Sequence, residues 1–151
     1  MKILLAIDGS DCSNAAVEAL VTQYKPQDTE VLVTNVVESL KLMPVSYGFG
    51  TGPIFPESYV AIAQQWRTEG EKLVAEAADR LQSAGFKTST SVEEGDARER
   101  ILDCAEKWRP DVILVGSHGR RGIDRLLLGS VSEAIARHAG CSVEIVRAKA
   151  A

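Results

Sequence analysis

Hydrophobic and polar positions along the chain follow two periods that alternate from one end to the other. Continuous apolar runs are typical of strands buried on both faces, and they occur at 2–7, 30–37 and 111–115. A short, more polar segment at 86–92 predicts a strand at a sheet edge, and alternating apolar and polar residues at 141–147 predict a fifth strand. Apolar residues at three- and four-residue steps predict helices over 10–25, 59–84, 97–108 and 130–139. Strands that alternate with helices in this way predict an α/β fold: one doubly wound parallel sheet with helices on both faces.

Capping residues and apolar stripes refine the predicted helices. Ser10 or Asp11 can cap the first helix, and Asp96 with Glu99 has the spacing of a capping box for the third. The second helix carries one long apolar stripe that we expect to be buried throughout, consisting of Tyr59, Ile62, Ala63, Trp66, Leu73, Ala77 and Leu81.

Residues 38–56 have neither period. They contain repeated glycine and proline residues, which predicts a long surface loop within one domain spanning 1–151. Loops of this length in a compact domain are usually functional or mobile. The run G-F-G-T-G at 48–52 does not join a strand directly to a helix, so it does not match a dinucleotide-binding fingerprint.

Composition and charge narrow the function classes. The chain is 45% hydrophobic and 25% charged, as in ordinary globular domains. A net charge of −4 argues against a broad nucleic-acid interface. The N-terminal apolar run is too short for a signal peptide, and no apolar run is long enough to span a membrane. Cys12, Cys104 and Cys141 form no CxxC pair, and we expect each to be a small buried hydrophobic residue in a reducing compartment.

The segment 112–133 carries the strongest chemical signal. Gly116, Gly119, Gly129 and Ser130 lie between a buried strand and a helix, where glycine lets the backbone approach a ligand closely. The free N–H groups at a helix N-terminus are natural donors to phosphate. This spacing therefore predicts a phosphate-binding loop. Asp8 follows the first strand, so the two segments would form opposite walls of one crevice if the first and fourth strands are neighbours.

Structural interpretations of the same residues remain open. Gly116 can simply terminate a strand, and Ser130 with Glu133 has the spacing of a capping box. Asp8 can cap a helix or form a turn. The side chain of His118 can be solvated, with its backbone alone near a ligand.

The chain resembles the universal stress protein family, in its nucleotide-binding branch. The resemblance lies in the Gly-x2-Gly-x9-Gly-Ser motif at 116–130, in I-D-G-S at 7–10 and in V-V-E at 36–38, and it extends over nearly the whole chain. It implies strand order 3-2-1-4-5, a cytoplasmic location, binding of ATP (or AMP or ADP) with magnesium or manganese as a further ligand, and homodimers made through the last strand, Cys141 to Arg147. The family commonly has Cys-Pro-Val at the start of that strand, whereas Ser142 follows Cys141 here, and Glu144 interrupts a usually apolar run.

The resemblance also implies roles for individual residues. Asp8 would hold the ribose or adenine side of the nucleotide, and the backbone of Val36 would read the adenine edge. The ribose and phosphates would be held by Gly116, His118, Gly119, Gly129, Ser130 and Val131. The chain has no Gly-x4-Gly-Lys-Ser/Thr motif, so the phosphate-binding lysine of that class is missing. We therefore expect a regulatory or sensor module that binds ATP; the alternatives are a weak Mg-dependent ATP hydrolase and a dimeric interaction module without nucleotide.

Overall fold

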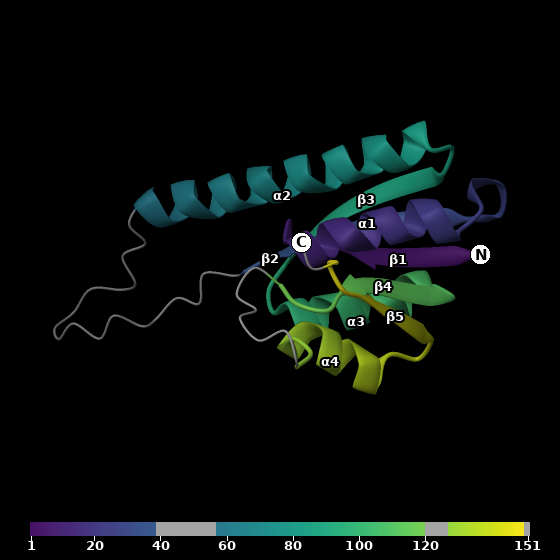
Figure 1. Ribbon diagram of the computed structural model, residues 1–151. Coiled ribbons are helices and arrows are strands. Elements are labelled where there is room, and N and C mark those ends of the chain that lie inside the picture. The colour runs from purple at the N-terminus through teal and green to yellow at the C-terminus, as the bar shows by residue number, and fades with distance from the viewer. Residues whose placement is uncertain (39–56, 120–126, 150–151) are drawn as a thin grey trace, which may run out of the picture.

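The computed structural model describes residues 1–38, 57–119 and 127–149. Five parallel strands form one sheet in the order β3-β2-β1-β4-β5 (Figure 1), which confirms both the predicted α/β class and the strand order. The strands are β1 Lys2–Ala6, β2 Glu30–Val37, β3 Lys87–Glu94, β4 Val112–Gly116 and β5 Ser142–Val146. The helices are α1 Asp11–Gln23, α2 Glu57–Ser83, α3 Ala97–Trp108 and α4 Ser130–His138, with a short 3-10 turn at Pro26–Asp28.

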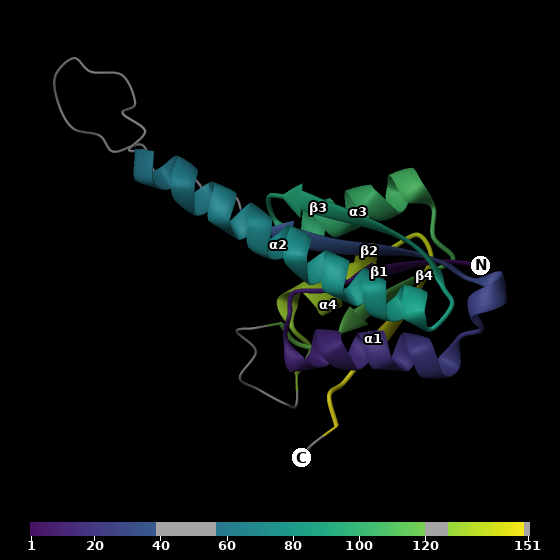
Figure 2. The same ribbon diagram turned by 90° about the horizontal axis from the view of Figure 1, so that it is seen from above.

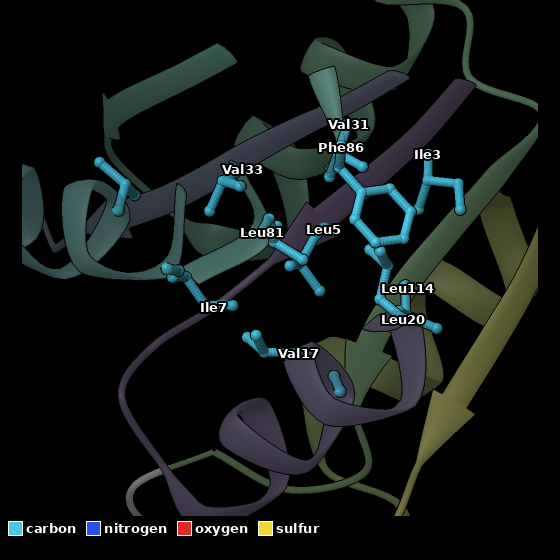
Figure 3. Packing of buried hydrophobic residues seen from close by; sticks show 13 residues of the cluster. Ile3, Leu5, Ile7, Val17, Leu20, Val31, Val33, Leu81, Phe86 and Leu114 are labelled. Atoms are coloured by element: carbon cyan, nitrogen blue, oxygen red, sulfur yellow. The ribbon is translucent and has the colours of Figure 1, made fainter. Parts of the chain in front are cut away.

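The central strand β1 is buried on both faces, as its apolar sequence predicts. Ile3, Leu5 and Ile7 lie in the core cluster formed with α1 and α2 (Figure 3). Leu4 and Ala6 lie in the cluster on the opposite face, with α3 and α4. Because successive side chains of a strand point to opposite faces, one continuous apolar run supplies both cores. The four helices therefore cover the sheet in pairs, α1 with α2 and α3 with α4.

Helix α2 has two halves that pack differently. Buried residues begin at Gly70 and include Val74, Ala77 and Leu81. In the N-terminal half, Tyr59, Ile62 and Ala63 are exposed and Trp66 is only partly buried. Figures 1 and 2 show the reason: this half extends beyond the strands. The expectation of a buried stripe along the whole helix is wrong for these residues, because the helix is longer than the sheet that it covers.

Helix capping follows the sequence at α1 and α3. The side chain of Ser10 accepts a hydrogen bond from the Ser13 N–H at 3.2 Å, and that of Asp96 accepts one from the Arg98 N–H at 2.9 Å. The predicted surface loop lies outside the described residues except for Glu38, which is exposed. None of the described helices is long and apolar enough to cross a membrane.

Candidate functional site

In a doubly wound sheet a ligand crevice is expected where the winding changes direction, which in this sheet is between β1 and β4. The chain leaves β1 into α1, which packs on one face, and it leaves β4 toward α4, which packs on the other. Loops that leave neighbouring strands in opposite directions separate at the carboxyl ends of those strands, and ligands of doubly wound sheets bind there. The structure thus confirms that β1 and β4 are neighbours, the condition for Asp8 and the β4 loop to face each other.

The turn after β1 is held by its own polar groups and by the neighbouring turn. Gly9 has φ 78°, a left-handed conformation that favours glycine. The Ser10 N–H donates to Asp8 Oδ1 at 3.0 Å, so Asp8 closes the turn. The Ser10 hydroxyl donates to the backbone carbonyl of His118 at 3.2 Å. Ser10 therefore caps α1 and links the two turns that border the crevice.

Gly116 ends β4 against the backbone of α1. A Cβ added at Gly116 would lie 2.7 Å from the Cys12 carbonyl carbon and 2.8 Å from the Ser13 nitrogen. Real Cβ atoms essentially never approach that closely, and backbone atoms on both sides cannot move aside easily. The absence of a side chain at Gly116 therefore lets β4 pack closely against α1. Gly116 therefore has a structural role at the contact between β4 and α1, and it also stands at the start of the predicted phosphate-binding loop.

Ser117 organises the turn after β4, and it is only 1% exposed. Its N–H donates to the Val146 carbonyl at 2.7 Å. Its own carbonyl accepts from the Gly129 N–H at 2.8 Å and from the Ser132 hydroxyl at 2.9 Å. These bonds bring the beginning of α4 back to the end of β4, although eleven residues of sequence, 118–128, separate Ser117 from Gly129. Ser117 thereby fixes where the α4 N-terminus lies.

The N-terminus of α4 differs from those of α1 and α3. Its N-cap residue is Gly129, which makes no side-chain cap hydrogen bond, and Ser130 is the first helical residue. The predicted Ser130–Glu133 capping box is therefore wrong; Glu133 instead pairs with Arg137 at 2.8 Å. Because glycine has no side chain, the N-cap residue itself supplies no acceptor for the first-turn N–H groups of Ser130 and Val131. The helix dipole adds positive potential at this end.

Asp8, His118, Gly119 and Gly129 are brought together by these turns. A Cβ added at Gly119 would lie 2.7 Å from Asp8 Oδ2, and one added at Gly129 would lie 3.4 Å from the His118 Cα and 3.1 Å from the Ser117 carbonyl oxygen. His118 Nδ1 lies 3.1 Å from Ser117 Oγ. Its Nε2 is buried and lacks a hydrogen-bond partner in the part of the chain that the structure describes. The β1 and β4 turns thus form one connected wall beside the α4 N-terminus.

Val36 lies apart from this group, near the end of β2. The last β1–β2 pair is Ala6 with Thr34, and the Ile7 N–H donates to the Thr34 carbonyl at 2.9 Å. Backbone groups two residues apart point to the same edge of a strand, so those of Val36 face the space beyond the end of β1. Its side chain packs against the core shared with α3 and α4. Val36 is therefore placed at the side of the crevice away from α4.

Several expected contributions fall outside the described residues or find no support there. The loop sequence also contains Arg120, Arg121 and Arg125, whose positive charge could meet a phosphate or simply be solvated, and these residues lie outside the described ranges. Across residues 1–38, 57–119 and 127–149, no group of three or more His, Cys, Asp or Glu side chains is arranged to hold a metal ion. The three cysteines are free, and each is partly exposed, which corrects the expectation that they are buried.

Sequence reasoning missed four polar residues that position the site: Ser10 as a link between turns, Asn35, Ser117 and Ser132. Asn35 is 6% exposed and donates to the Ile7 carbonyl at 2.7 Å, which holds the chain just before Asp8. Its signal in the sequence was a polar residue inside an apolar strand. Ser117 and Ser132 offered no comparable signal, because their partners are backbone groups distant in the sequence.

Comparisons with known proteins agree with this geometry. The sequence model of the universal stress protein family matches residues 1–147. The universal stress protein YxiE of Bacillus subtilis is 32% identical over 148 residues, which cover 97% of this chain and 98% of that protein. The universal stress protein MJ0531 of Methanocaldococcus jannaschii is 30% identical over 146 residues, covering 97% and 81%.

Solved structures show the same fold. That of hypothetical protein MJ0577 aligns with a TM-score of 0.82 and 24% identity over 99% of this chain and 97% of its own. An Arabidopsis thaliana universal stress protein family protein with AMP bound aligns at 0.72 and 20% identity over 99% and 93%. A universal stress protein in complex with cAMP aligns at 0.68 and 21% identity over 99% and 98%.

Proposed function

Because this chain belongs to the universal stress protein family, we propose that it binds an adenine nucleotide, with ATP as the favoured ligand, and acts as a regulatory or sensor module. The observation that carries the proposal is the uncapped N-terminus of α4. It lies beside the connected turns of β1 and β4, at the point where ligands of doubly wound sheets bind. AMP and cAMP in two structural relatives support the choice of an adenine nucleotide.

The residues present fit a phosphate group at one end of the site. Gly129, the α4 N-cap, carries no side chain that would occupy the space in front of the first-turn N–H groups. Ser130 and Val131 would donate these N–H groups to phosphate oxygens, and the Ser130 hydroxyl is a further donor. When bound, the nucleotide would bring negative charge to the positive end of the helix dipole. The β4 turn, with Gly116, His118 and Gly119, would form the wall beside it.

The nucleoside would lie toward β1 and β2. The Asp8 carboxylate lies against Gly119, and it would accept hydrogen bonds from ribose hydroxyls or from the adenine amino group. The backbone groups of Val36 would pair with the adenine edge in the space beyond the end of β1. Asn35 and Ser10 would act as positioning residues, because they hold the chain on either side of Asp8.

Gly129→Asp tests the phosphate end of the proposed site. Gly129 has φ −66° and ψ 154°, which any L-residue can adopt, and Asp is a favoured N-cap that stabilises helices by roughly a few tenths of a kcal/mol relative to Gly. Its carboxylate would occupy the phosphate position and repel the ligand. We expect the affinity for ATP, measured by isothermal titration calorimetry, to fall at least about tenfold. Equal affinity in Gly129→Asp and the unmodified protein would overturn the placement.

Two control variants separate the causes. Gly129→Ala adds the same Cβ, 3.1 Å from the Ser117 carbonyl oxygen, without the carboxylate. Gly140→Asp adds the same charge at a position where a Cβ meets nothing within 4 Å, beyond the other end of α4. We expect Gly140→Asp to bind ATP as the unmodified protein does, and Gly129→Ala to lose less affinity than Gly129→Asp.

The same samples distinguish the alternative functions. Phosphate release that requires magnesium, scales with protein and disappears in Asp8→Asn would identify a slow hydrolase, with magnesium or manganese bound beside the phosphates. The absence of both bound nucleotide and a thermal shift with millimolar ATP would identify an interaction module without nucleotide.

We also propose a homodimer through β5, the edge strand next to β4. Glu144, which interrupts a run that is usually apolar in the family, finds a partner within the same chain. The Tyr24 hydroxyl donates to its carboxylate at 2.6 Å. This bond holds Glu144 on the α1 face, while Val143 and Ile145 pack on the opposite face. Sedimentation equilibrium tests the proposal: a monomer at micromolar concentration would overturn it.

A further inference from the structure

Cys12 contacts the β4 turn from the first turn of α1. Its sulfur lies 3.5 Å from Ser117 Oγ, and the hydroxyl of Ser117 is buried beneath it. The approach depends on Gly116, where an added Cβ would lie 2.8 Å from the Cys12 Cβ. As a residue, Cys12 is nevertheless partly exposed.

Hydrogen-bond donors from separate segments surround the Cys12 sulfur. Burial opposes ionisation of the thiol, but hydrogen bonds from the Ser117 hydroxyl and from the backbone of Ala148 and His118 outweigh it and lower the pKa of Cys12. The N-terminal end of α1 adds favourable potential for an anion. Asp11, the neighbouring acidic residue, acts in the opposite sense. Donors from two segments that are distant from Cys12 in the sequence, 117–118 and Ala148, thus converge on one sulfur atom.

The protonation of the His118 ring determines which atoms donate and which accept in the hydrogen bonds of Ser117. Ser117 Oγ lies between the Cys12 sulfur and His118 Nδ1, 3.1 Å from the latter. His118 Nε2 is buried without a partner among the described residues, and a buried N–H without an acceptor costs about 1–3 kcal/mol. The proton therefore favours Nδ1, which donates to Ser117 Oγ. The Ser117 hydroxyl then has its own proton to donate to sulfur, an arrangement suited to the thiolate.

The other two cysteines have the opposite environment. Burial raises the pKa of Cys104, and the charge of Glu93 raises it further. Burial also raises the pKa of Cys141. Both pack against the core cluster of α3 and α4. They are internal controls for the reactivity of Cys12.

We propose that Cys12, with Ser117 and His118, is a modification site at which a small peroxide oxidises the thiolate to a sulfenic acid. The sulfur attacks one peroxide oxygen, an S–O bond forms and the O–O bond breaks. The displaced hydroxide takes a proton and leaves as water, so the sulfur is oxidised and the peroxide is reduced. The added oxygen would lie against Ser117, whose carbonyl holds the Gly129 N–H. The inference does not depend on nucleotide binding.

Competitive labelling of the folded protein tests the proposal. With limiting iodoacetamide at neutral pH, mass spectrometry should show Cys12 alkylated roughly tenfold faster than Cys104 or Cys141, as a higher thiolate fraction predicts. The difference should disappear in urea. After treatment with hydrogen peroxide, dimedone should trap sulfenic acid at Cys12. Labelling of Cys12 no faster than that of the other two, or sulfenic acid forming first elsewhere, would overturn the proposal.

Two serine variants separate activation from exposure. Ser117→Ala removes the donor to sulfur, so the labelling rate of Cys12 should fall several-fold, while unchanged rates at Cys104 and Cys141 would show that the fold is retained. Ser132→Ala removes a buried hydroxyl from the same turn that donates to the Ser117 and Gly129 carbonyls and not to sulfur. Cys12 should keep its rate in that variant. Equal rates in both variants would exclude the role of Ser117.

Discussion

Two glycines bring a helix close to the sheet, Gly116 at the α1 contact and Gly70 at the α2 contact, and their surroundings differ. A Cβ at Gly116 would meet the backbone of Cys12 and Ser13. A Cβ at Gly70 would meet side chains: Asn35 Oδ1 at 2.6 Å, Val37 Cγ1 at 3.1 Å and Val92 Cγ1 at 3.2 Å. Side chains can change rotamer, whereas two backbone segments of a core cannot separate at low cost. The first contact is therefore rigid and the second can adjust.

This difference changes how the glycine motif is interpreted. Gly116 belongs to the phosphate-loop pattern, but its closest neighbours lie in α1, so loss of ATP binding in a Gly116 variant would report damage to the fold. Gly70 belongs to no motif, yet it leaves room for Asn35, which holds the Ile7 carbonyl next to Asp8. A glycine inside a motif can thus be structural, and one outside it can support the site.

The largest expected effect is at the rigid contact. Gly116→Ala should lower the free energy of unfolding by about 3 kcal/mol, because α1 must move away from β4. Urea denaturation followed by circular dichroism measures this change. A loss below about 1 kcal/mol would show that the α1 contact adjusts as easily as the α2 contact.

Gly70→Ala should have a smaller effect. Alanine improves helix propensity by about 1 kcal/mol, but its Cβ displaces Asn35 and crowds two valines, so we expect a net loss of about 1 kcal/mol. A double-mutant cycle with Asn35→Ala measures the coupling. Because Asn35→Ala removes the closest neighbour, Gly70→Ala should be less harmful in that background. An equal loss in both backgrounds would contradict the assignment of Asn35 as the neighbour that moves.

The contact between the C-terminal end of α1 and β5 can be tested through its dependence on pH. Burial and the hydrogen bond to Glu144 raise the pKa of Tyr24 to about 12, above the unfolded value of about 10. Since the pKa of Tyr24 is higher in the folded state, the stabilisation that Tyr24 provides is complete below about pH 10. It is lost as the pH rises toward 12. Tyr24→Phe should lose about 1 kcal/mol of stability at pH 8.

Thermal denaturation from pH 8 to pH 12 measures that contribution. The difference between Tyr24→Phe and the unmodified protein should shrink with increasing pH. A difference that stays constant would show that the hydrogen bond to Glu144 does not stabilise the fold.

The smallest effect is expected where α2 extends beyond the sheet. Ile62 is 41% exposed, so Ile62→Ala should change the free energy of unfolding by less than about 0.5 kcal/mol. Leu81 is fully buried on the same helix, and Leu81→Ala should cost about 2–5 kcal/mol. Similar losses in both variants would show that the N-terminal half of α2 is covered in solution.

Periodicity was sufficient to predict the α/β class and the succession of strands and helices, since each element needed only its own pattern of apolar residues, whereas the strand order came from the family resemblance. It failed at the N-terminal half of α2, because a local pattern does not show where the underlying sheet ends. For the site, Asp8 and the glycine pattern could be located from the sequence. The role of Ser117 could not, because it depends on backbone groups from β5 and α4 that only the folded chain brings together.

Nucleotide binding is tested most directly by mass spectrometry of the small molecules released when freshly purified protein is denatured. We expect an adenine nucleotide, chiefly ATP, in nearly equimolar amount to the chain. Protein that releases no adenine nucleotide, and that gains none after incubation with millimolar ATP, would contradict a nucleotide site at the carboxyl ends of β1 and β4.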